Sequence, residues 1–265
     1  MKKLILSAVL AVGLAASAHA QYVDGDLILG FRTTGAGSTV NLQVDLGNLT
    51  AFQAYAPGGT LLTNLTGFGS NSISDASVFG ASWNRSDVLW GAVGTLNSVD
   101  NTLIASEAAA SSLLNGLATT QNTTGGYGRS SSGGLATASA RITSLSTTQT
   151  STVNVVPTTN SNSWQVLEQI PPAVSFKRWT PGLFENNTSA LNLSNASSYV
   201  ASDLWLIAPG TAGAPSTFLG TLALFGNGNV EFFAAAIPEP STYAMILGVA
   251  ALGFVMIRRR QQSLA

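Results

Sequence analysis

The fold is indicated most clearly by the stretch TFLGTLALF-GNGN-VEFFA, residues 217–234. Two apolar runs, residues 217–225 and 230–234, flank the tetrapeptide Gly-Asn-Gly-Asn. Glycine and asparagine tolerate the positive φ that tight hairpin turns require, so this stretch predicts a β-hairpin. A second hairpin is predicted near the start of the chain, where residues 26–32 and the alternating residues 40–46 enclose a turn-rich segment.

Further short elements are expected between these two hairpins. The strand patterns are short apolar runs, at residues 88–94, 101–105, 154–156 and 204–207. The helix patterns begin after a capping residue or carry one apolar stripe, at residues 48–55, 72–80, 108–117 and 135–146. Together they predict a β-rich α+β domain of antiparallel hairpins with short helices, in which the first and last hairpins share a sheet. A β-sandwich is the alternative.

Residues 119–162 differ from the rest of the chain in composition. Ser, Thr, Ala, Gly and Asn dominate there, and large apolar residues are few. Such a stretch is typical of a surface excursion or a weakly packed insertion. A linker between two domains is the alternative interpretation.

The last thirty residues form three physically distinct parts. Pro238-Glu239-Pro240 is a rigid, non-helical strip, because each proline fixes φ and disfavours helix in the residue before it. A charge-free run follows, and a transmembrane helix is expected at residues 242–257. At 1.5 Å per residue, the charge-free run of residues 243–257 spans roughly 22 Å, which is short against roughly 30 Å of bilayer hydrocarbon. The cluster Arg258, Arg259 and Arg260 is expected to stay in the cytoplasm.

The order of these parts resembles the PEP-CTERM protein-sorting domain, over about residues 237–261 only. The resemblance implies that the chain is an exported substrate of exosortase, a membrane transpeptidase or protease of Gram-negative bacteria that make extracellular polysaccharide. It implies that Pro238, Glu239 and Pro240 form the recognition site. Bodies that carry this tail are diverse, so the resemblance implies nothing about residues 21–236. A plain C-terminal membrane anchor is the alternative.

The start of the chain has the pattern of a secretory signal peptide. Lys2 and Lys3 precede an apolar run at residues 4–16, and Ala18-His19-Ala20 fits a small-x-small cleavage site. Residues 1–20 are therefore expected to be removed, with the Sec translocon and signal peptidase as partners. Residues 21–236 would then be the exported domain.

Composition excludes several kinds of chemistry. The chain has no cysteine, and its one histidine, His19, lies within the predicted signal peptide. A Ser–His–Asp triad, a Cys nucleophile and a His/Cys zinc site are therefore excluded in the exported part, and no cofactor, metal or catalytic residue is expected. Five of the eleven basic residues lie in the terminal segments, so the body is mildly acidic and nucleic-acid binding is disfavoured.

Carboxylate chemistry remains open. The carboxylates at issue are scattered along the sequence, at Glu107, Glu168, Glu185 and Asp203. The sequence cannot place two of them at the roughly 5–9 Å that glycoside hydrolysis requires. The aromatic residues Phe79, Trp83 and Trp90 are expected in the core, with stacking on sugar rings as the alternative role.

The sequence therefore predicts a non-enzymatic exported protein. It would be tethered to the inner membrane by its C-terminal helix, processed by an exosortase-like enzyme, and delivered to the cell surface or the extracellular matrix. Extracellular polysaccharide is a candidate partner. The alternatives are a carbohydrate-binding or carboxylate-dependent glycan-active protein, and an unprocessed single-pass membrane protein.

Overall fold

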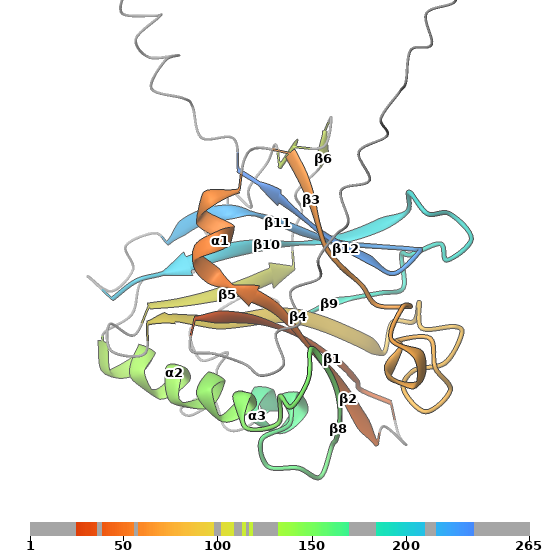
Figure 1. Ribbon diagram of the computed structural model, residues 1–265, viewed down its shortest axis with the longest axis horizontal. Helices are drawn as coiled ribbons and strands as arrows, with labels where there is room; N and C mark the ends of the chain where they lie inside the picture. Colours follow the sequence, from red (N-terminus) through yellow and green to blue (C-terminus); the bar gives the residue numbers. More distant parts are fainter. Residues whose placement is uncertain are drawn as a thin grey trace, which may run out of the picture.

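A computed structural model describes residues 25–35, 39–55, 58–97, 102–108, 113–114, 117–118, 132–169, 184–209 and 216–235. Within them, one antiparallel ten-stranded sheet dominates the fold (Figure 1). Its strand order is β3-β12-β11-β10-β5-β4-β1-β2-β8, and β9 pairs with β4 beside this path.

The sheet strands are β1 (Asp26–Thr33), β2 (Val40–Asn48), β3 (Gly58–Asn64), β4 (Val88–Asn97), β5 (Thr102–Ala108), β8 (Val153–Pro157), β9 (Asn186–Asn187), β10 (Tyr199–Ile207), β11 (Thr217–Phe225) and β12 (Asn229–Ala234). A separate two-stranded sheet contains β6 (Leu113–Leu114) and β7 (Leu117–Ala118). The helices are α1 (Leu49–Ala54), α2 (Ser132–Ser146), α3 (Trp164–Gln169) and the 3₁₀ turn η1 (Gly69–Asn71).

Both predicted hairpins are confirmed. The β11–β12 hairpin turns at residues 226–228, where Gly228 has a φ of 84°. The β1–β2 hairpin pairs Phe31 with Leu42 and Leu29 with Val44. The two hairpins belong to the same sheet, as predicted, with β10, β5 and β4 between them. This continuous strand order replaces the alternative of a β-sandwich with two separate sheets.

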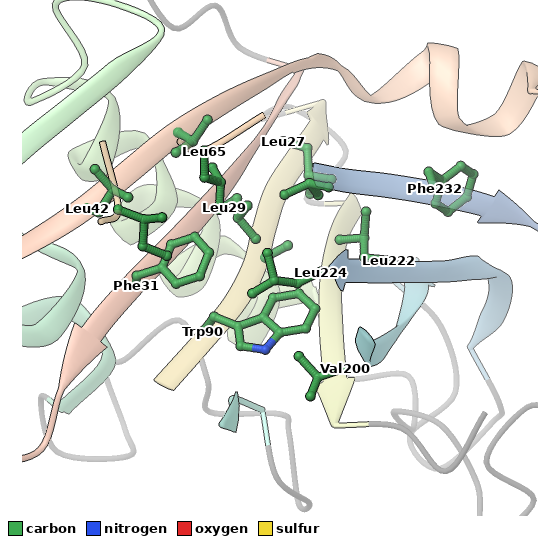
Figure 2. Packing of buried hydrophobic residues seen from close by; sticks show 14 of the residues in the cluster. Leu27, Leu29, Phe31, Leu42, Leu65, Trp90, Val200, Leu222, Leu224 and Phe232 are labelled. Atoms are coloured by element: carbon green, nitrogen blue, oxygen red, sulfur yellow. The ribbon is translucent and has the colours of Figure 1, made fainter. Parts of the chain in front are cut away.

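The sheet curls so that the β12–β11 arm faces the β1–β2 arm across one hydrophobic core. Figure 2 shows side chains from both arms meeting there, with Trp90 of β4 close to Phe31 of β1 and to Leu224 of β11. Helix α1 contacts β2, β4 and β12, so it connects the two arms. Its Phe52 packs edge-on against Phe232 of β12, at 5.1 Å between ring centroids.

The opposite face of strands β1, β2, β4 and β5 is contacted by α2 and α3 (Figure 1). Strand β1 is buried along its whole length, and successive side chains enter different cores because they alternate between the two faces. Leu29 belongs to the core inside the curl, whereas Ile28 packs with Ile142 of α2 and Leu167 of α3. Residues 132–162, the described part of the Ser/Thr-rich stretch, supply α2 and the edge strand β8.

Two predicted helices are wrong. Residues 72–80 form turns after η1, because the Asp75 side chain accepts hydrogen bonds from the Ser77 amide and hydroxyl, and such local bonds compete with helix. Within residues 108–117, Ala108 ends β5, and Leu113–Leu114 pairs with Leu117–Ala118 as a short hairpin. Helix α3 was not predicted. The helix after Asn48 is confirmed, and Asn48 caps it by accepting from the Thr50 amide at 2.9 Å.

Among the helices of the described residues, none combines the length and the apolar character needed to span a bilayer. The transmembrane helix expected at residues 242–257 lies outside the described residues.

Candidate functional site

The predicted sorting site begins where the described sheet ends. The amide of Ala235 donates to the carbonyl of Leu219 at 3.0 Å, and this bond extends the pairing of β12 with β11 by one residue. The sorting and processing residues Pro238, Glu239 and Pro240, the arginines 258–260, and Ala18 and Ala20 of the signal peptide all lie outside the described residues.

The strand that leads into the sorting segment is firmly anchored. Phe232 is fully buried in the core inside the curl, and Phe233 is only 5% exposed on the other face. The backbone of β11 approaches this strand so closely that a Cβ on Gly220 would lie 2.3 Å from the Phe233 carbonyl oxygen. Gly220 has a φ of 149°, so glycine is required there for both space and conformation.

The scattered carboxylates are brought together in pairs by the fold. Glu168 of α3 and Glu185, just before β9, both approach the guanidinium of Arg32 on β1. The Arg32 Nε donates to the Glu185 carboxylate at 2.9 Å and 3.0 Å, and Nη2 lies 3.2 Å from Glu168 Oε2. The indole of Trp164 donates to Glu185 Oε1 at 2.8 Å. Burial excludes this cluster from solvent, so it locks α3 and the β9 segment onto β1.

The electrostatics of this cluster are set by burial. Desolvation raises the pKa of the Glu185 carboxyl, and the hydrogen bonds and charge of Arg32 work against that rise. Burial alone would lower the pKa of Arg32, but the two carboxylates raise it overall. The arginine is therefore charged at every physiological pH, and its charge is matched inside the protein.

A close approach between Gly30 and Trp164 holds α3 in place. Gly30 of β1 pairs with Gly91 of β4, and a Cβ on Gly30 would lie 1.9 Å from Cδ2 of the indole. A glycine inside an otherwise apolar strand often marks such an approach. This signal was present in the run DLILGFRT, whereas the ion pair of Arg32 was not visible in the sequence.

The other two carboxylates face each other across neighbouring strands. Asp203 of β10 is the register partner of Glu107 of β5, and the Thr221 hydroxyl of β11 donates to Asp203 at 3.0 Å. Both carboxylates are buried, with exposed fractions of 0% and 8%. Within the described residues, no group of three His, Cys, Asp or Glu side chains could hold a metal ion.

The predicted core aromatics are confirmed. Phe79, Trp83 and Trp90 are all buried, so none of them offers a ring to a sugar. Trp164 and Trp205 are buried as well, and Trp179 lies outside the described residues. The aromatic argument for carbohydrate binding therefore does not hold for any tryptophan in the described part of the chain.

One open polar pocket lies where β1, β2 and the turn at residues 75–79 meet. It has a volume of about 350 Å³, and Thr33, Thr39, Ser77, Arg85 and Asp87 supply its polar groups. Arg85 Nε donates to Asp87 at 2.8 Å, and its Nη1 donates to the Phe79 carbonyl at 3.0 Å. The hydrogen bond from Arg85 lowers the pKa of the Asp87 carboxyl, so this wall presents a fixed pair of opposite charges.

Comparison with known protein families gives one match, the PEP-CTERM protein-sorting motif, at residues 236–260. Neither curated proteins nor solved structures gave a match. The motif indicates export through the membrane to the cell surface and sorting that depends on an exosortase as the processing partner. It starts one residue after the last described residue of the sheet. The chain therefore carries, directly behind the last β-strand of its described residues, the sorting motif of PEP-CTERM proteins.

Proposed function

We propose that this chain is a non-enzymatic exported protein of the cell surface or extracellular matrix, delivered and processed through its C-terminal tail. The observation that carries the proposal is the match of residues 236–260 to the sorting motif. The apolar run and the three arginines behind Pro238-Glu239-Pro240 support a tether that stops in the inner membrane. An exosortase-like enzyme then acts on the strip from the outer side of the bilayer.

The start of the chain supports the same route. The basic, apolar and small-x-small order of residues 2–20 fits cleavage by signal peptidase after translocation through Sec. The protein would then exist first as an intermediate held by its C-terminal helix. Processing would release it into the matrix or attach it at the surface, where extracellular polysaccharide is the proposed partner.

Two observations favour a body without catalytic activity. Beyond His19 the sequence contains neither histidine nor cysteine, which removes the commonest general bases and thiol nucleophiles. The carboxylates Glu168 and Glu185, which the fold brings together, are buried on Arg32, where a substrate could not reach them.

The double substitution Pro238→Ala and Pro240→Ala tests the processing step. The molecular mass of the protein would be followed in membrane and secreted fractions of its host. The unsubstituted chain is expected to lose its C-terminal segment, and the variant is expected to accumulate in the membrane at full length. Pro157→Ala, at the exposed end of β8, is the matched control and should be processed normally. A full-length membrane form of the unsubstituted chain would instead establish the unprocessed single-pass protein.

A second candidate function is binding of a neutral sugar in the open pocket. Its volume lies near the lower end of the roughly 300–1,000 Å³ of ligand sites. Asp87 can accept from one hydroxyl of a diol, and each terminal nitrogen of Arg85 has a second N–H for a further acceptor. Titration with neutral monosaccharides, followed by NMR, should shift resonances of residues 76–79. The shifts should vanish in Asp87→Asn and persist in Glu231→Gln.

A further inference from the structure

β3 pairs with β12 at the end of the sheet where the described part of β12 finishes, and β7 contacts both strands. Gly58 and Gly59 of β3 pair there with Ala234 and Phe233 of β12, so two of these four positions carry no side chain. On the other side, Thr217 begins β11 and is exposed. Because β12 and β11 are antiparallel, the start of β11 and the end of β12 lie at the same end of the sheet.

The sorting strip can reach only a short distance from this end. Among the described residues, Ala235 is the last one hydrogen-bonded to the sheet, and Pro238 follows three residues later. A chain spans at most about 3.3–3.6 Å per residue, so Pro238 lies within about 11 Å of Ala235 and Pro240 within about 18 Å. An enzyme that binds the strip must therefore work next to the folded domain.

The domain cannot lengthen the strip by releasing β12. Release would expose Phe232, which is fully buried against Phe52, and would also expose Phe233 and Ala234, which are at most 5% exposed. Release would also break the backbone hydrogen bonds that β12 makes with β11 on one side and with β3 on the other. The distance between the sheet end and the strip is thus fixed by the fold.

From this geometry we propose that the sheet end formed by Gly58, Thr217, Leu219 and Ala235 is the surface that faces the processing enzyme. The partner is a membrane-embedded transpeptidase or protease that binds the strip on the outer side of the bilayer. Because so few residues separate Ala235 from the strip, the enzyme has to approach this end of the domain in order to bind it. This inference depends on the proposed function, because it presumes that the strip is processed.

Added bulk at this end tests the proposal. Thr217→Tyr places a large side chain beside the exit of β12, and Ala196→Tyr places the same side chain near the opposite end of the sheet, where Tyr199 pairs with Phe225. Because misplacement of a substrate by about 1 Å can slow a reaction substantially, we expect processing of Thr217→Tyr to be about tenfold slower. Ala196→Tyr should be processed at the unsubstituted rate.

A spacer shows whether Thr217→Tyr is processed slowly because the new side chain crowds the enzyme or because the domain is misfolded. Ten Gly/Ser residues inserted after Ala235 add a mean reach of about 16–19 Å and should restore the processing of Thr217→Tyr. A second variant lacks Ala236 and Ile237, the two residues between Ala235 and Pro238, and should also be processed slowly until the same spacer is added.

The outcomes are distinguishable. Equal rates for Thr217→Tyr, Ala196→Tyr and the unsubstituted chain would overturn the inference while leaving processing intact. A shortened tail that the spacer fails to rescue would also overturn it, since the two residues would then be recognised by identity rather than needed for reach. If the unsubstituted chain is not processed at all, the proposed function fails first.

Discussion

Gly30 is a position where a small change should have a large effect on stability. The substitution Gly30→Ala adds one methyl group, which would lie 1.9 Å from Cδ2 and 2.0 Å from Cε3 of the Trp164 indole. Real carbon contacts are near 3.5–4.0 Å, so either the indole or the strand has to move. The indole cannot move alone, because its Nε1 is bonded to Glu185 at 2.8 Å and its ring stacks on Phe184.

The magnitude follows from these contacts. Overpacking in a core typically costs about 1–3 kcal/mol in free energy of unfolding. Displacing the indole also breaks its hydrogen bond to a charged carboxylate, worth about 1.5–3 kcal/mol. We therefore expect Gly30→Ala to lower the free energy of unfolding by about 3–5 kcal/mol, a large share of the roughly 5–15 kcal/mol of a typical domain.

Urea unfolding of the purified chain, followed by tryptophan fluorescence, measures this loss. The matched control is Gly67→Ala, whose added methyl would meet its nearest neighbour at an ordinary 3.5 Å. That control should stay within about 0.5 kcal/mol of the unsubstituted protein.

A double-mutant cycle identifies the cause. Trp164→Ala should itself cost about 3–5 kcal/mol, as for other buried aromatic residues. In that background the indole is gone, so Gly30→Ala should cost less than about 1 kcal/mol and the pair should couple by at least about 2 kcal/mol. If Gly30→Ala costs the same in both backgrounds, the clash with Trp164 is not the reason for the glycine.

Four further predictions concern other parts of the fold. Glu185→Gln should destabilise the protein by about 1.5–3 kcal/mol in urea, because a neutral amide replaces the charged acceptor of Arg32 and Trp164 while Glu168 still balances the Arg32 charge. Phe232→Ala should cost about 3–5 kcal/mol, measured in the same way, since its ring is fully buried between the two arms of the sheet. Asn48→Ala should cost about 1 kcal/mol through the lost cap of α1, and Asn48→Ser should retain most of it. The hydrogen bond from Arg85 lowers the pKa of Asp87 in the folded protein. The stability that ionised Asp87 contributes should therefore be present above the ordinary Asp pKa and be lost as the pH falls through the lowered pKa of the folded state. In Asp87→Asn, the melting temperature should depend less on pH across that acidic range.

The parts of the fold that the sequence predicts are those with a local cause. The β11–β12 hairpin follows from Gly226-Asn227-Gly228-Asn229, because few residues adopt the backbone angles of such a turn. The cap of α1 follows from Asn48, whose side chain bonds the Thr50 amide only two residues away. The wrong helix at residues 72–80 has a local cause too, since Asp75 makes a turn that competes with the helix.

The candidate site also has a part that the sequence predicts and a part that it does not. The sorting segment can be recognised from the sequence because each part has a local property: the prolines stiffen the backbone, the following run is apolar, and the arginines are a cluster of positive charge. The cluster of Arg32, Glu168 and Glu185 was not predictable, because its members come from β1, α3 and the segment before β9, up to 153 residues apart. Nothing in the immediate neighbourhood of Glu185 indicates which cation it meets.

By itself, the sequence of this protein determined its destination and its hairpins, since both depend on the properties of short consecutive segments. The tertiary structure alone decided which strands became neighbours, which carboxylates met, and how little chain separates the domain from its sorting strip. Strand order in a curled sheet is fixed by burying both faces at once, as β1 does between the inner core and α3. Burial of both faces depends on residues from distant parts of the chain, so it cannot be predicted from any one segment.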